Sequence, residues 1–140
     1  MSSTFQLQNN TLKELPHNIE AEQGILGAIL LNNEIFFDIS ETINVEHFYE
    51  PVHKLIFDVI GKMISKGQIA TPITLKSFFE VEKNLEEIGG SNYLVRLANS
   101  AVSLDYAKNY AHIIYNLAVR MGIYELGGKV KHYAIESEIE

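Results

Sequence analysis

The longest helical pattern in the sequence lies near its C-terminal end, and it limits what the chain can fold into. It runs from Leu104 to about Ala134, and the residue before it, Ser103, is a good N-cap. No proline occurs after Pro72. A helix of roughly 30 residues, rising ~1.5 Å per residue, is too long to be covered by a core of roughly 100 residues. We therefore expect part of this helix to project from the rest of the chain and to need a partner.

Large apolar residues recur along this helix in alternating steps of four and three, which is the spacing of a coiled-coil seam. The seam consists of Tyr110, Ile114, Leu117, Met121 and Tyr124. Glycines at 122, 127 and 128 weaken the helix, and a kink or break near Gly127 stays open.

Five tyrosines lie on the long helix, at positions 106, 110, 115, 124 and 133, and they cannot all face a small head. Tyrosine is favoured at protein interfaces, because it offers a large contact area at low entropy cost. We favour an interaction surface along this helix, with ordinary packing inside the chain as the alternative.

The clearest helix in the rest of the chain spans Pro51 to Lys66. Its apolar residues follow the i, i+3, i+4, i+7 pattern of an amphipathic helix, proline suits its first position, and Gly67 suits its end. The apolar residues are Val52, Leu55, Ile56, Val59, Ile60, Met63 and Ile64.

Shorter helices are predicted on both sides of this one. The first runs from Asn18 as N-cap to about Leu31, with Glu20 and Glu22 in its first turn facing the helix dipole. Its Gly24 and Gly27 would let a neighbouring helix approach closely. Further helices are expected at 34–40, after Thr74 as N-cap, and after Ser91 as N-cap. Phenylalanines 36, 37, 57, 78 and 79 are expected in the core.

Strand signals are weak, so the expected fold class is all-α: a compact multi-helix head followed by a long C-terminal helix. Residues 1–17 are read as a flexible N-terminal lead, 18–100 as the head and 101–140 as the arm. Because the chain ends in Glu136, Glu138 and Glu140 without a closing helix, we expect it to be cut from a larger protein.

Composition excludes several classes of function. The chain has no cysteine, which rules out disulfides and thiolate metal sites. Its 11 basic residues are scattered among 18 acidic ones, so tight direct binding of DNA is not expected. The longest apolar run, 24–31, is far short of the roughly 20 residues that span a bilayer, and no secretory signal is visible. A cytoplasmic protein is the default expectation.

No catalytic or cofactor-binding constellation is visible either. The chain has no GxxxxGK[ST] loop, no GxGxxG after a strand and no GxSxG. Glu50-x-x-His53 has the spacing of a di-iron ligand pair, but such a site needs a second uninterrupted pair, so a structural or surface histidine is favoured. Gly89-Gly90-Ser91 before a helix is read as a turn rather than as a phosphate site. We predict no catalytic, cofactor-binding or metal-binding residue.

Five short motifs occur in one order over about residues 16–120. They are P-x-[SN]-x-E-A-E-Q-x-x-L-G at 16–27, F-Y…H-[RK]-x-I-[FY] at 48–57, [VI]-T-L at 73–75, G-G-x-x-Y-L-x-x-L at 89–97, and Y-A-x-I near 110–113 with Arg120 further on. Their order and spacing resemble the N-terminal domain of bacterial DnaB-type replicative DNA helicases. The joins at 67–72 and 102–106 depart from the family pattern.

The resemblance implies a function that the residues alone do not reveal. Intact proteins of this family are rings of six subunits that unwind DNA at the replication fork, moving 5′ to 3′ with ATP and magnesium bound in a RecA-like C-terminal domain. Their N-terminal domains form a collar, a trimer of dimers joined through heads and helical hairpins. The collar recruits primase, and a helicase loader is a further possible partner. Contact with DNA would occur only through the intact ring.

Applied to this sequence, the resemblance implies that the chain contains the head and the first arm of the hairpin. It would end before the second hairpin helix and the ATPase domain, and it would have no catalytic site of its own. Tyr93, Tyr124 and Val130 match family positions linked to primase. With the seam residues, the candidate interface is therefore Tyr93, Tyr110, Ile114, Leu117, Met121, Tyr124 and Val130. A free-standing helical adaptor and a small metal- or ligand-binding enzyme are the competing hypotheses.

Overall fold

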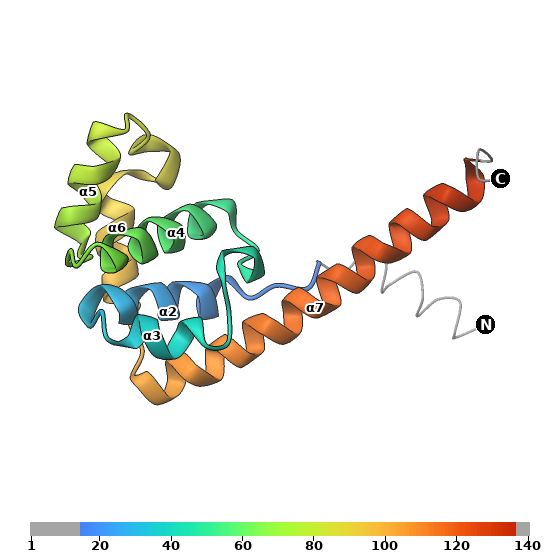
Figure 1. Cartoon of the computed structure of the whole chain (residues 1–140), viewed down its shortest axis with the longest axis horizontal. Coiled ribbons are helices and arrows are strands. Elements are labelled where there is room, and N and C mark those ends of the chain that lie inside the picture. The colour runs from blue at the N-terminus through green and yellow to red at the C-terminus, as the bar shows by residue number, and fades with distance from the viewer. Residues whose placement is uncertain (1–14, 137–140) are drawn as a thin grey trace.

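The structure is a computed structural model that describes residues 15–136, and within this range it is helical without a β-strand. The α-helices are α2 (Ile19–Leu31), α3 (Ile35–Ser40), α4 (Pro51–Ser65), α5 (Pro72–Val81), α6 (Gly90–Asn99) and α7 (Leu104–Ile135). Two short 3-10 helices, η1 (Val45–His47) and η2 (Glu86–Ile88), lie between them. Figure 1 shows α2 to α6 gathered into a head and α7 extending away from it. The predicted all-α fold is confirmed.

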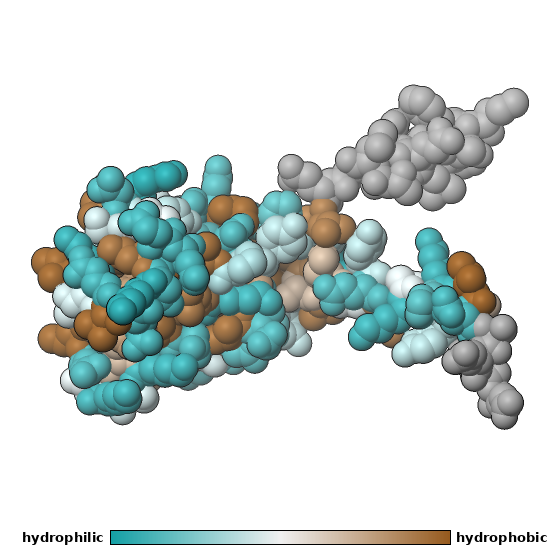
Figure 2. Space-filling model, turned by 90° about the horizontal axis from the view of Figure 1, so that it is seen from above, coloured by the Kyte–Doolittle hydropathy of each residue, from teal (hydrophilic) through white to brown (hydrophobic). Residues whose placement is uncertain are grey.

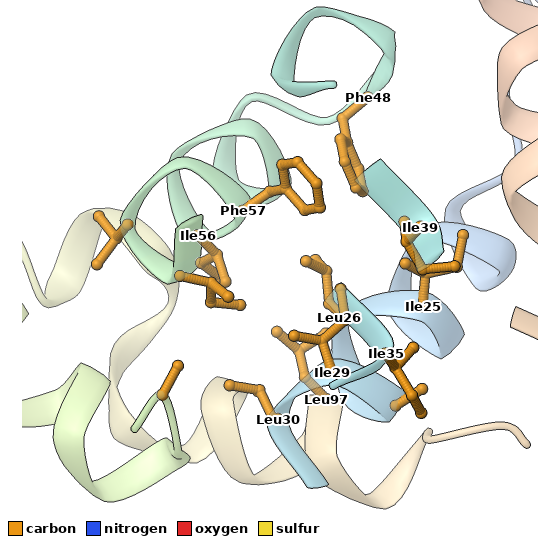
Figure 3. Close-up of a cluster of buried hydrophobic side chains, with 14 of the residues drawn as sticks. Ile25, Leu26, Ile29, Leu30, Ile35, Ile39, Phe48, Ile56, Phe57 and Leu97 are labelled. Carbon is orange, nitrogen blue, oxygen red and sulfur yellow. The ribbon is translucent and has the colours of Figure 1, made fainter. Parts of the chain in front are cut away.

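The head is built around α2, which is apolar on nearly its whole surface. Ile25, Leu26 and Ile29 on this helix are completely buried. Figure 3 shows side chains from α3, α4 and α6 pointing toward the same region, including Ile39, Ile56, Phe57 and Leu97. A helix that is apolar all round is stable in water only where other helices cover it, so the sequence of α2 places it at the centre.

Two glycines allow the helices around α2 to come close, as the sequence predicted. A Cβ atom on Gly27 would lie 2.0 Å from the carbonyl oxygen of Leu97 and 2.8 Å from the backbone nitrogen of Ala101. A Cβ atom on Gly24 would lie 3.2 Å from the ring of Tyr110 on α7. The backbone of α2 is therefore packed directly against the end of α6, and its neighbouring face meets α7.

Most helix starts and ends follow from local chemistry, and the predictions for α2, α4 and α7 are confirmed. The side chains of Asn18 and Ser103 accept the backbone N–H of Ala21 and Tyr106. Pro51 occupies the first position of α4, and Gly67 follows that helix with a φ of +73°.

Two predicted N-caps are wrong. α5 begins three residues earlier than predicted, because Thr71 accepts the N–H of Thr74 and Pro72 suits the first helical position. α6 begins at Gly90 with Gly89 as its N-cap, and Ser91 lies inside the helix. Gly89 has a φ of +93°, a conformation that glycine adopts without strain and serine does not.

The predicted phenylalanine core is correct only in part. Phe57 and Phe79 are buried, and Phe36 and Phe78 pack half-buried against the core. Phe37 is 54% exposed. Helix α3 has only six residues and can turn one side inward; Ile35 and Ile39 occupy that side, which leaves Phe37 outside.

The long helix is continuous, so the break considered near Gly127 does not occur. Of its 32 residues, the buried ones are Ala107, Ala111 and Ile114, all in the first third of the helix. From Gly122 to Glu136 every residue is exposed. As predicted, a large part of this helix projects beyond the head, and none of the described residues 15–121 buries it. Most of the proposed lead lies outside the described residues.

Candidate interaction surfaces

The predicted seam on α7 divides into an inner and an outer part. Ile114 is 2% exposed and Tyr110 is packed against the core, so both side chains are used within their own chain. Leu117 and Met121 are half-buried at the point where α7 leaves the head. Tyr124 is 62% exposed. The outer part of the seam is therefore the part that another polypeptide could contact.

A cavity of about 300 Å³ lies at the base of the arm, between the head and α7. Leu117 and Met121 line it on the arm side, and residues 16–18 and 46–49 line it on the head side. The stacked rings of His17 and Tyr49, 4.3 Å apart between centroids, form part of its wall. The cavity joins the half-buried part of the seam to the surface of the head.

A second apolar stripe on α7 was missed by the sequence reasoning. It follows steps of four and three, as the predicted seam does, and every member is 46–64% exposed: Val119, Ile123, Leu126, Val130 and Tyr133. At ~100° per residue it lies about 120° around the helix from the buried residues of α7. Of the predicted site residues, Val130 belongs to it.

This outer stripe gives the arm an apolar surface that the head does not touch. Figure 2 shows hydrophobic residues on the projecting part of the chain among polar ones. The stripe could have been found in the sequence, because its spacing is as regular as that of the seam. It was overlooked because its central members are aliphatic residues next to glycines and charges.

Tyr93, the remaining predicted site residue, lies on α6 and contacts other residues of the head. Its hydroxyl oxygen is 2.5 Å from Nε2 of His53 and 3.3 Å from Nε2 of Gln23. Arg96 lies over its ring, 5.7 Å from the centroid. The structure therefore does not bring Tyr93 together with the seam residues.

Glu22 and His53 form a buried polar pair behind Tyr93. The exposed fractions of these residues are 1% and 0%, and Nδ1 of His53 lies 2.7 Å from Oε1 of Glu22. The backbone N–H groups of Tyr49 and Glu50 also donate to the Glu22 carboxylate, at 2.8 and 3.3 Å. Glu22 lies in the first turn of α2, as predicted. The sequence did not show that its side chain is buried in the head, where it contacts His53.

Burial raises the pKa of the Tyr93 hydroxyl above its ordinary value of 10.0, although the Gln23 hydrogen bond and the positive charge of Arg96 act in the opposite direction. The nearby carboxyl groups of Glu50 and Glu22 also raise this pKa. The hydroxyl is therefore neutral at physiological pH and acts as a hydrogen-bonding group.

The described residues do not offer a metal site or a membrane span. In residues 15–136 no group of three or more histidine, aspartate or glutamate side chains could hold a metal ion. Both ring nitrogens of His53 are engaged by Glu22 and Tyr93, which leaves the Glu50-x-x-His53 pair without a ligating nitrogen. None of the described helices has the length and apolar character needed to cross a membrane.

Comparison with known proteins matches these features to one family. The family model described as the DnaB-like helicase N-terminal domain matches residues 14–116. The chain is 41% identical over 126 residues to the replicative DNA helicase DnaB of Rickettsia felis, and 42% identical over 125 residues to that of Rickettsia typhi. These alignments cover 90% and 89% of the chain but 26% and 25% of the relatives, so the chain spans about a quarter of their length.

Solved structures show the same fold. The crystal structure of the N-terminal domain of DnaB helicase from Mycobacterium tuberculosis has a TM-score of 0.82 at 29% identity, and the match covers 86% of this chain and 88% of that one. A DnaB-like replicative helicase, solved in a study of its interactions with primase, has a TM-score of 0.67 at 27% identity, covering 84% of this chain and 28% of that one. The head, the long arm and the matched motifs thus have one explanation: the chain belongs to the family of DnaB-like helicase N-terminal domains.

Proposed function

We propose that this chain is the N-terminal collar domain of a replicative DNA helicase, and that it joins copies of the protein and docks primase. The observation that carries the proposal is the outer half of α7, which leaves the head with an exposed apolar stripe. If the helix contacted nothing outside its own chain, the exposed side chains of this stripe would be expected to be polar. Exposed apolar side chains arranged in a stripe mark a site of contact with another polypeptide.

Self-association through the arm is the simplest way to cover this surface. A twofold dimer places the same stripe of one copy against that of the other, and the four–three spacing suits helix–helix contact. We propose a monomer–dimer equilibrium for the 140-residue chain and a trimer of dimers in a whole helicase. The contact between the two arms would use the outer stripe, with Val130. Leu117, Met121 and Tyr124 lie on the opposite side of α7, so they would contact a further helix or partner.

Primase is the partner we propose for the collar. Support comes from the solved relative that was studied with primase. The family resemblance adds that Tyr93, Tyr124 and Val130 would occupy positions linked to primase. Tyr93 lies in the head and Val130 on the arm. Primase would therefore contact the arm and be affected by Tyr93 indirectly, through the packing of the head, or it would contact both residues in an assembled collar. A helicase loader is a further proposed partner.

We propose no catalytic role for the chain itself. In a whole helicase of this family, ATP and Mg²⁺ would bind in the RecA-like domain, which would supply hydrolysis and 5′–3′ unwinding. The formal charge of −7 disfavours direct DNA binding by this chain, so we propose that DNA is contacted only through the ring. The proposed location of the whole helicase is the cytoplasm.

The test is a calorimetric titration of purified bacterial primase into this chain and into two variants with equal charge changes. Val130→Glu places a charge on the outer stripe, where contact would require its desolvation. Asn109→Glu places the same charge on an exposed position of α7 beside the head. We expect at least tenfold weaker binding for the first variant, or ~1.4 kcal/mol, and no change for the second. Equal binding by all three proteins, or no binding by the unmodified chain, would contradict the proposal.

A further inference from the structure

The polar side chains buried most deeply in the described part of the chain, Glu22 and His53, have no part in the interfaces proposed above. Glu22 belongs to α2, His53 to α4 and Tyr93 to α6, so their hydrogen bonds connect three helices of the head. The order of contacts is Gln23 to Tyr93, Tyr93 to His53, and His53 to Glu22. Buried polar groups are rarely retained unless each has a hydrogen-bond partner, so the protons of this network must be placed to satisfy all of its members.

The backbone determines the direction of this chain of hydrogen bonds. The N–H of Tyr49 can only donate to Oε2 of Glu22, and that of Glu50 can only donate to Oε1. A carboxyl group with donors on both oxygens is most stable as a carboxylate, which accepts and cannot donate. Nδ1 of His53 must then be the donor in the 2.7 Å contact with Glu22.

The opposite side of the ring follows from the same logic. In a neutral imidazole with the proton on Nδ1, Nε2 is an acceptor. Tyr93 therefore donates its hydroxyl proton to Nε2, over 2.5 Å, and its oxygen accepts from the side-chain amide of Gln23. Every group in the network then has a partner of the right kind.

We infer that Glu22 and His53 are positioning residues for Tyr93, which hold its hydroxyl inward as a hydrogen-bond donor. Tyr93 is half-buried with Arg96 over its ring, and its hydroxyl donates its proton to His53. A partner that depends on Tyr93 would contact the ring and the helix that this network orients. The inference concerns the chain alone and stands whether or not the proposed function is correct.

The direct test is the tautomer of His53, measured by ¹⁵N NMR of the histidine rings in the 140-residue chain at neutral pH. His53→Gln identifies the His53 signals, because it removes them. We expect a neutral ring with a protonated Nδ1 and an unprotonated, strongly downfield Nε2. A ring protonated on Nε2, alone or together with Nδ1, would overturn the inference.

Glu22→Gln provides a second test, whose readout would not change if Glu22 only stabilised the fold. Its carbonyl oxygen can keep the shorter bond, from the N–H of Tyr49 at 2.8 Å, and give up the 3.3 Å bond from Glu50, which turns its NH2 group toward Nδ1 of His53. We expect the His53 proton to move from Nδ1 to Nε2, so that the downfield signal changes from one nitrogen to the other. Glu20→Gln, on the exposed side of the same helix, is the matched control and should leave the His53 signals unchanged. A folded Glu22→Gln chain with the original tautomer would overturn the inference.

Tyr93→Phe keeps the inference testable if Glu22→Gln does not fold. Because Glu22 rather than Tyr93 sets the tautomer, the proton should stay on Nδ1 after the hydroxyl is removed, while the Nε2 signal shifts as it loses its donor. Movement of the proton to Nε2 in this variant would overturn the assigned direction.

Discussion

The two halves of α7 belong to one continuous helix and are stabilised in different ways. In the half beside the head, Ala107, Ala111 and Ile114 are buried, and small side chains let α7 lie close to α2. In the outer half, Ile123 and Leu126 are 64% and 59% exposed although they are as apolar as the buried residues. The two halves therefore do not differ in the type of side chain. They differ in burial, because the head extends along only the first half of α7.

The outer half of α7 is expected to be less stable as a helix than the inner half. The outer half contains Gly122, Gly127 and Gly128, and a Cβ atom added at any of them would meet nothing within 4 Å among residues 15–136. Glycine lowers helix propensity, and helices in proteins gain most of their stability from tertiary packing, which the outer half lacks. We therefore expect the outer half to open more readily than the inner half until another polypeptide covers it.

The largest expected difference between the halves comes from two isoleucines of α7. Ile114→Ala leaves a cavity in the core and should lower the free energy of unfolding by about 2–5 kcal/mol. Ile123→Ala removes an exposed side chain and should change it by less than ~0.5 kcal/mol. Urea unfolding of dilute protein measures both. Similar losses in the two variants would mean that the outer half is covered by its own chain.

Glycines sharpen the same comparison, with a smaller expected effect. Gly27→Ala forces a methyl group against the backbone of Leu97 and should destabilise the head by about 1–3 kcal/mol or more. Gly128→Ala meets open space and should stabilise the arm by about 0.5–1 kcal/mol, seen as a gain in helical circular dichroism. If Gly27→Ala were neutral, the close packing of α2 on α6 would be wrong.

The smallest expected effect separates Tyr93 in the head from the tyrosines of the arm. Because the pKa of Tyr93 is raised in the folded state, folding favours its protonated form. The associated stability is present below pH 10 and is lost as the pH rises through the folded-state pKa. Above pH 10, the free energy of unfolding should therefore decrease more steeply with pH for the unmodified chain than for Tyr93→Phe. Parallel curves would contradict the burial of this hydroxyl.

The sequence was sufficient to predict the fold class and the main helices, because these depend on periodicity and caps. The proline at the start of α4, the Asn18 and Ser103 caps and the apolar stripe of α4 are local signals, and all were confirmed. Thr71 and Gly89 were missed as caps because Thr74 and Ser91 nearby are equally good candidates by residue type. Which residue of each pair is the N-cap depends on its backbone conformation, and the turn before the helix determines that conformation.

Much of the candidate site could not be predicted from the residues alone. Nothing local shows that Glu22 points inward, since its partner His53 is 31 residues away and the donors at Tyr49 and Glu50 are backbone groups. Similarly, the spacing of the seam did not reveal that Ile114 is buried while Tyr124 is exposed. That division depends on how far the head reaches along α7, which is a property of the packed tertiary structure.

The central claim is that the outer half of α7 is an uncovered apolar surface that another polypeptide shields, and sedimentation of the chain over a range of concentrations tests it most directly. We expect the average mass to rise from monomer toward dimer with concentration. Ile123→Glu and Leu126→Glu, both on the outer stripe, should each shift this equilibrium toward monomer by tenfold or more, while Asn109→Glu should leave it unchanged. A mass that stays monomeric at every concentration, or association that survives both arm variants, would contradict the account.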